Sequence, residues 1–106
     1  MKFNLQIKPL SVNEAFKGRR FKTDKYNQFQ NQMLSLLPKA EIKSFKRLKL
    51  TFGMSNSLSD IDNPVKMTID CLQKKYGIND RDLIYLQLHK VKTEKGAEFI
   101  EVEFLE

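Results

Sequence analysis

Between residues 44 and 76 the apolar residues change from the spacing of a strand to that of a helix. In SFKRLKLTFGMS basic residues separate the apolar ones, as in a half-buried strand: Phe45, Leu48, Leu50 and Phe52. Further on, four apolar residues recur at i, i+4, i+7 and i+11 and share one helix face: Val65, Ile69, Leu72 and Tyr76. A strand followed by an amphipathic helix predicts a fold in which helices pack on a sheet.

Residues with known capping preferences mark the ends of two predicted helices. Asn63 and Pro64 are a favourable N-cap and first-turn pair for the helix described above, and Gly77 is a natural C-terminal stop. A second helix is predicted in TDKYNQFQNQMLSLLP, with Thr23 or Asp24 as its cap and the final proline as its end. Its apolar residues are Tyr26, Phe29, Met33, Leu36 and Leu37.

The remaining segments supply strands near both ends of the chain. MKFNLQIK has the alternation of a strand, which Pro9 ends, and the basic segment SVNEAFKGRRFK is expected to be a loop. LIYLQLHKVK and AEFIEVEFLE flank TEKG, which predicts a β-hairpin with its turn at Gly96. We therefore expect one α/β (α+β) domain over residues 1–106, a mixed β-sheet with two helices packed on it, in the order β-α-β-α-β-β.

The charge of the chain is divided between its halves. Through Gly53 there are 12 Lys or Arg against 3 Asp or Glu, and from Met54 onward there are 7 against 10. This division suggests a surface for polyanions beside a site that needs carboxylates, although solvated loops and helix faces would also account for the basic residues. The single Cys71 excludes a disulfide framework and a multi-cysteine zinc site. No segment has the apolar length of a membrane span or a signal peptide, so a cytoplasmic protein is expected.

Three aspartates stand close together in this otherwise basic chain: Asp60, Asp62 and Asp70. In an extended strand Asp60 and Asp62 would project from the same side. Two carboxylates about 4 Å apart repel by about 1 kcal/mol in water and about 4 kcal/mol at an intermediate dielectric. A divalent cation such as Mg²⁺ offsets that repulsion, because hard cations take oxygen ligands. In the alternative interpretation, Asp62 or Asn63 caps the helix and Asp60 is solvated.

A lysine and a later acidic segment extend this cluster. Lys66 lies in the first helical turn, where a lysine beside a metal site stabilises charge on a phosphate under attack. In the alternative interpretation Lys66 only forms an i, i+4 ion pair with Asp70, worth about 0.2–0.5 kcal/mol. The segment GINDRD, residues 77–82, precedes the last two strands, and we expect it to return a carboxylate to the same edge of the sheet.

These residues resemble the signature of the RusA-type Holliday junction resolvases. The similarity covers Asp60-Ile61-Asp62-Asn63, Lys66, Asp70, Leu72, Gly77 and Asp80, and upstream Pro9-Leu10-Ser11-Val12-Asn13. It extends from Pro9 into the last strands, and DxDNxxK followed by Asp-x-Leu is its most specific part. One departure is Asn79-Asp80, where the family usually has two adjacent acidic residues.

The resemblance implies a homodimeric endonuclease, dependent on Mg²⁺ with Mn²⁺ as a substitute, that resolves four-way DNA junctions by paired symmetric nicks. The implied metal ligands, which are also catalytic, are Asp60, Asp62 and Asp80. The implied essential lysine is Lys66. The resemblance gives three further candidates. Asp82 is an alternative to Asp80 as the third carboxylate, Asp70 matches the family's helix aspartate, and Asn13 lies in the upstream segment.

Binding of DNA is expected at the densest cationic run of the chain: Lys17, Arg19, Arg20 and Lys22. Arginines suit bidentate phosphate contacts, and Phe16 and Phe21 either stack on exposed bases or pack into the core. Two other functions stay open, a non-catalytic DNA-binding module whose aspartates brace a helix and a metal-dependent nuclease for other branched DNA such as flaps. The apolar faces of residues 83–88 and 99–104 are the candidates for dimer contact.

Overall fold

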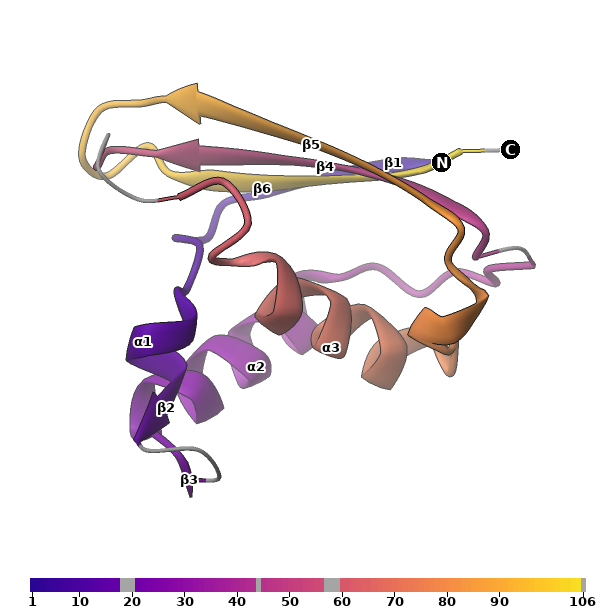
Figure 1. Cartoon of the computed structure of the whole chain (residues 1–106), viewed down its shortest axis with the longest axis horizontal. Coiled ribbons are helices and arrows are strands. Elements are labelled where there is room, and N and C mark those ends of the chain that lie inside the picture. The colour runs from indigo at the N-terminus through magenta and orange to yellow at the C-terminus, as the bar shows by residue number, and fades with distance from the viewer. Residues whose placement is uncertain (18–20, 44, 57–59, 106) are drawn as a thin grey trace.

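Two helices pack on one face of a four-stranded mixed sheet, so the fold class expected from the sequence is confirmed (Figure 1). The computed structural model describes residues 1–17, 21–43, 45–56 and 60–105, with the backbone alone for residues 17 and 21. The main elements are β1 (Lys2–Leu5), α2 (Asp24–Leu36), β4 (Arg47–Met54), α3 (Val65–Tyr76), β5 (Tyr85–Lys92) and β6 (Phe99–Leu105). Within the described ranges, none of the helices has the length and apolar character that crossing a bilayer requires.

The strand order β1-β6-β4-β5 corrects one expectation. β5 pairs with β4 in parallel, with Leu88 opposite Leu50, and β6 pairs with β4 antiparallel, with Val102 opposite Leu50. The predicted hairpin of the last two strands is therefore wrong, because β4 lies between β5 and β6. The connection 93–98 crosses the end of β4, so β6 lies inside the sheet between β1 and β4. Ile100 and Val102 of β6 are completely buried.

The core lies between the sheet and the two helices. β4 contributes three side chains with no exposed surface, and they are among the apolar residues predicted for this strand: Leu48, Leu50 and Phe52. Met33 on α2 and Met67 and Leu72 on α3 are equally buried against them. Full burial of an apolar side chain of this size contributes about 1.5–3 kcal/mol, so these contacts hold both helices on the sheet.

α2 begins as its sequence predicts. Thr23 is its N-cap, and the Thr23 hydroxyl accepts a hydrogen bond from the Tyr26 backbone N–H at 3.2 Å. The predicted apolar residues are buried with one exception, Leu36, which is 40 % exposed. Leu36 is the last helical residue, and the chain turns extended at Leu37, so that Leu37 takes the buried position instead.

The start of α3 differs from the sequence prediction. Asp60 to Pro64 form consecutive turns in which the Asn63 N–H donates to the Asp60 carbonyl and the Val65 N–H to the Asp62 carbonyl, each at 3.2 Å. The expected extended strand through Asp60 and Asp62 is therefore wrong, and the N-cap is Pro64 rather than Asn63. The C-terminus is as predicted, because Gly77 adopts the left-handed conformation with φ of 66°.

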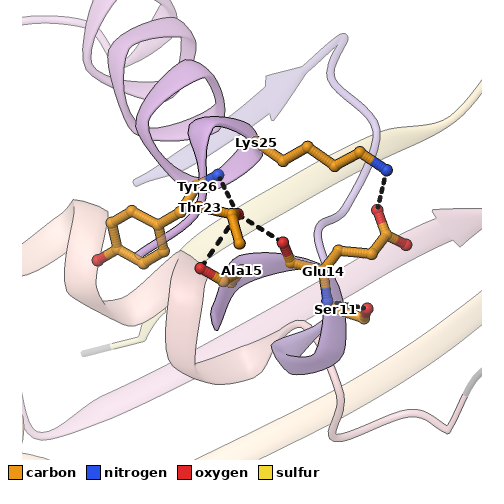
Figure 2. A network of polar contacts seen from close by, with 6 residues as sticks. All are labelled: Ser11, Glu14, Ala15, Thr23, Lys25 and Tyr26. Carbon is orange, nitrogen blue, oxygen red and sulfur yellow. Dashed lines mark hydrogen bonds and ion pairs between the residues drawn. The ribbon is translucent and has the colours of Figure 1, made fainter. Parts of the chain in front are cut away.

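The segment expected to be a basic loop has secondary structure of its own. It contains the one-turn helix α1 (Val12–Ala15) and a short antiparallel ladder of β2 (Phe16–Lys17) with β3 (Phe21–Lys22). The Thr23 hydroxyl lies 2.6 Å from the Glu14 carbonyl and 3.2 Å from that of Ala15, and the Thr23 N–H donates to Ala15 (Figure 2). Thr23 thereby joins the end of α1 to the start of α2, and this fixes the ladder beside α2.

Candidate functional site

A groove of about 430 Å³ runs between α3 and β5. Its apolar walls come from the two elements that bound it: Val65, Ile69, Leu86 and Leu88. Its polar lining consists of four residues that the sequence singled out: Asp62, Lys66, Asp70 and Asp80. The fold thus places three of the four residues predicted to be catalytic along one groove.

Two of the carboxylates that line the groove, Asp62 and Asp80, lie at its two ends, and Asp70 lies between them on α3. Asp62 directly precedes the first turn of α3, whereas Asp80 begins the short helix η1 (Asp80–Asp82) after α3 has ended. The twelve residues of α3 span about 18 Å at about 1.5 Å per residue, and Figure 1 shows η1 beside the far end of α3. We expected residues 77–82 to return a carboxylate to the edge of the sheet at which Asp60 and Asp62 lie. Within one chain this expectation is wrong, because Asp80 lies at the other end of α3.

The parallel pairing of β4 with β5 causes this separation. Asp60 and Asp62 follow the end of β4, and Asp80 precedes the start of β5. Parallel strands start at the same edge of a sheet, and here Arg47 pairs with Tyr85 at one edge and Met54 with Lys92 at the other. Among the described residues, accordingly, no three His, Cys, Asp or Glu side chains come close enough to hold a metal ion.

Two of the predicted ligands do suit a hard cation. Asp60 and Asp62 are both exposed and lie two residues apart on the turn before α3. Mg²⁺ commonly takes one or two protein carboxylates and completes its octahedral coordination with water and substrate phosphate. The chain therefore offers two exposed carboxylates at this turn, and the third predicted ligand, Asp80, lies at the other end of α3.

Lys66 and Asp70 do not form the ion pair that their spacing allows. The Lys66 ammonium lies 5.8 Å from the centre of the Phe16 ring. Asp70 instead accepts long hydrogen bonds from the Tyr26 hydroxyl at 3.5 Å and from the Gln73 amide at 3.4 Å. The described ion pairs include Lys2–Glu101 and Lys25–Glu14, and neither of these contains Lys66 or Asp70.

Asp70 adds its negative charge to the surroundings of two buried neighbours, Tyr26 and Cys71. Burial raises the pKa of the Tyr26 hydroxyl, and the negative charge of Asp70 raises it further. Burial, again with a smaller contribution from Asp70, raises the pKa of the Cys71 thiol to about 12. These contacts connect α2 to α3 through Asp70, so its position is explained by the packing of the two helices.

A second hollow, of about 520 Å³, adjoins the groove and shares Lys66 and Asp70 with it. The other lining residues come from β2, β3, α2 and α3: Phe16, Lys22, Tyr26, Gln30, Gln73 and Lys74. Sequence reasoning missed Tyr26 and Lys74 as site residues. The signal was present in the i, i+4, i+8 spacing of Lys66, Asp70 and Lys74, which sets the three on one face of α3.

The remaining sequence candidates lie apart from the groove or outside the described residues. Asp82 is exposed in η1, Asn13 is exposed in α1, and neither lines the groove or the hollow. Phe16 is half-buried and packs on Tyr26 with ring centres 5.5 Å apart, as the packing interpretation expected. Arg19 and Arg20, with the side chains of Lys17 and Phe21, lie outside the described part of the chain.

Comparison with known proteins adds no family assignment: no family model matches the chain, and no curated protein matches it significantly. The resemblance of Asp60 to Asp80 to the RusA-type signature thus rests on the residues themselves.

Proposed function

We propose that this chain is a Mg²⁺-dependent endodeoxyribonuclease that resolves four-way DNA junctions, acting as a homodimer in the cytoplasm of a bacterial or phage-infected cell. The observation that carries the proposal is the groove along α3, because Asp62 and Lys66 line it at one end and Asp80 lines it at the other. The RusA-type signature supports the same assignment, since it contains these three residues and Asp60.

The chain's own residues have distinct roles in the proposed reaction. Asp60 and Asp62 would hold Mg²⁺, or Mn²⁺ in its place, which supplies a bound water of lowered pKa for phosphodiester hydrolysis. Lys66 is exposed and not ion-paired with Asp70, so its ammonium is available to stabilise negative charge on the phosphate. Asp70 keeps the structural role given by its contacts with Tyr26 and Gln73.

A second copy of the chain would supply the third carboxylate. β5 is an edge strand that exposes the apolar side chains of Tyr85, Leu86 and Val91, and Ile84, directly before the strand, is exposed by 77 %. Pairing of β5 with its two-fold equivalent would be antiparallel, which sets the start of one β5 beside the end of the other. Asp80 of one copy would then approach the edge from which Asp60 and Asp62 of the other emerge. The second candidate face, residues 99–104, is less suitable because Ile100, Val102 and Phe104 are buried.

Replacement of Asp62 tests the proposed activity. Asp62→Asn keeps the size of the side chain but removes the charge that a cation needs, so we expect nicking of a labelled four-way junction in Mg²⁺ to fall by about 100-fold or more. Junction binding should be retained or improved, because repulsion of the DNA also falls. The matched control is Glu41→Gln, which removes an exposed carboxylate outside the groove and should cut like the wild type.

The same assay separates the proposed function from its two alternatives. Flap and linear duplex substrates are tested beside the junction, each with Mg²⁺ and with EDTA. Cutting of flaps in preference to junctions would indicate a nuclease for other branched DNA. Binding without any cutting would indicate a non-catalytic DNA-binding module, and wild-type cutting by Asp62→Asn would remove Asp62 from the site.

A further inference from the structure

We propose that the hollow between β3, α2 and α3 binds the phosphodiester backbone of a single DNA strand. The inference rests on the proposed function in taking DNA as the ligand. It adds a binding surface made of Lys22, Lys66 and Lys74, of which only Lys22 belongs to the cationic run and only Lys66 to the RusA-type signature. It also assigns a path to the strand that leaves the groove.

The charge of the hollow favours a polyanion. Three lysines line it against one aspartate, and all three lysines are exposed. Asp70 directs its two oxygens at Tyr26 and Gln73, and the Lys74 ammonium lies 3.4 Å from the Gln30 amide oxygen. The lysines are therefore held around the hollow by contacts with rings and amides, which leave their positive charge uncompensated by an ion pair.

The floor of the hollow is aromatic. Tyr26 is buried, Phe16 is half-buried against it, and the two ring centres are 5.5 Å apart. The Lys22 ammonium lies 4.8 Å above the Tyr26 ring, and the Lys66 ammonium lies 5.8 Å from the Phe16 ring. Contacts of this kind orient an ammonium without neutralising it, so two of the three cations are positioned before any ligand arrives.

The hollow continues the groove. Lys66 and Asp70 line both, so a strand whose phosphate lies at Lys66 has Lys22 and Lys74 along its onward path. The hollow, about 520 Å³ and widely open to solvent, suits a flexible single strand with separate phosphates. Proteins bind single strands with a positively charged groove that follows the backbone beside aromatic side chains, which makes a single strand the appropriate probe.

The test compares two double variants that remove the same total charge. Lys22→Ala with Lys74→Ala empties the hollow of two cations, whereas Lys39→Ala with Lys95→Ala removes two exposed lysines outside it. Binding of a fluorescent oligothymidylate is measured against salt concentration in EDTA, so that no cutting intervenes. For the hollow variant we expect the slope of log Kd against log salt to fall by about 1.4, from two lost contacts at about 0.7 each on single strands. The control variant should keep the wild-type slope.

Two further measurements make each outcome decisive. Lys22→Arg with Lys74→Arg keeps the charge and should restore the slope, and thermal melting confirms that all three variants fold. Equal slopes for the hollow variant and its control, or no binding of the oligonucleotide by the wild type, would overturn the inference. Junction cutting by the wild type in Mg²⁺ is scored separately. If the wild type cuts the junction but the hollow variant and its control have equal slopes, the inference about the hollow is wrong and the proposed function stands. If the slope of the hollow variant changes but the wild type does not cut, the inference about the hollow is supported and the proposed nuclease activity is wrong.

Discussion

Cys71 is a buried thiol whose ionisation is coupled to folding. Burial, with the charge of Asp70, raises its pKa to about 12, whereas a thiol in the unfolded chain titrates near about 8.5. Above the unfolded value the unfolded chain releases a proton that the folded chain keeps, so rising pH favours unfolding. The stabilising contribution is complete below about pH 8.5 and declines as the pH rises toward the folded value.

Urea denaturation at about pH 8 and about pH 10 measures this coupling. We expect the free energy of unfolding to fall over that interval, by at most about 1.4 kcal/mol per pH unit for one thiol. Cys71→Ala lacks the ionising group and should show a shallower decline, although its stability at pH 8 is lower. Burial also raises the pKa of Tyr26 and Tyr76, but both proteins contain these tyrosines, so the difference between the two proteins reports on the thiol. Identical pH dependence in the two proteins would show that the thiol is not protected by the fold.

At the residue scale, sequence reasoning identified candidates but not their partners. Lys66 and Asp70 have the spacing of an ion pair, yet Asp70 contacts Tyr26 and Gln73 instead. Tyr26 lies 44 residues away in the chain, so no local pattern predicts its contact with Asp70. The sequence therefore predicted that Lys66 and Asp70 lie on α3, but it did not show which side chains they contact.

At the scale of elements, Thr23 connects two helices through one side chain. Its hydroxyl caps α2 and reaches the last carbonyls of α1, which fixes the β2–β3 ladder that carries Phe16 and Lys22 (Figure 2). Loss of an N-cap hydroxyl costs about 0.5–2 kcal/mol. We expect Thr23→Ala to lower the free energy of unfolding by about that amount in urea denaturation.

Thr23→Ser is the matched control, because it keeps the hydroxyl and removes a methyl group. It should retain most of the wild-type stability. If Thr23→Ala and Thr23→Ser were equally stable, the hydroxyl contacts would contribute nothing to holding α1 and α2 together.

The elements that local patterns predict well are those with strong periodicity and clear ends. α2 and α3 follow from their apolar spacing, from Thr23 and from Gly77. The last two strands were located correctly, but their pairing was not, because Gly96 and the strand pattern give no indication that β4 lies between β5 and β6. Pairing is decided by which strands bury most apolar surface, a property of the whole sheet.

At the scale of the whole molecule, the topology determines what one chain can do alone. Parallel pairing of β4 and β5 places Asp60 and Asp62 at one end of α3 and Asp80 at the other. The sequence places Asp62 before the helix and Asp80 after it, but it does not show that β4 and β5 pair in parallel, which puts the two ends of α3 at opposite edges of the sheet. The sequence therefore named Asp62, Lys66 and Asp80, which line one groove, while the distance between its two ends follows from the fold.

The central claim is that two copies of the chain together form each nuclease site, and mixing two inactive variants tests it. Asp62→Asn and Asp80→Asn should each fail to nick a four-way junction in Mg²⁺. In a mixed dimer one site would contain both native aspartates, so an equal mixture should recover about a quarter of the wild-type nicking, because half of randomly formed dimers are mixed and each has one intact site of two. If the mixture stays inactive while the wild type cuts and both variants dimerise, the carboxylates do not act across the dimer and the account is contradicted.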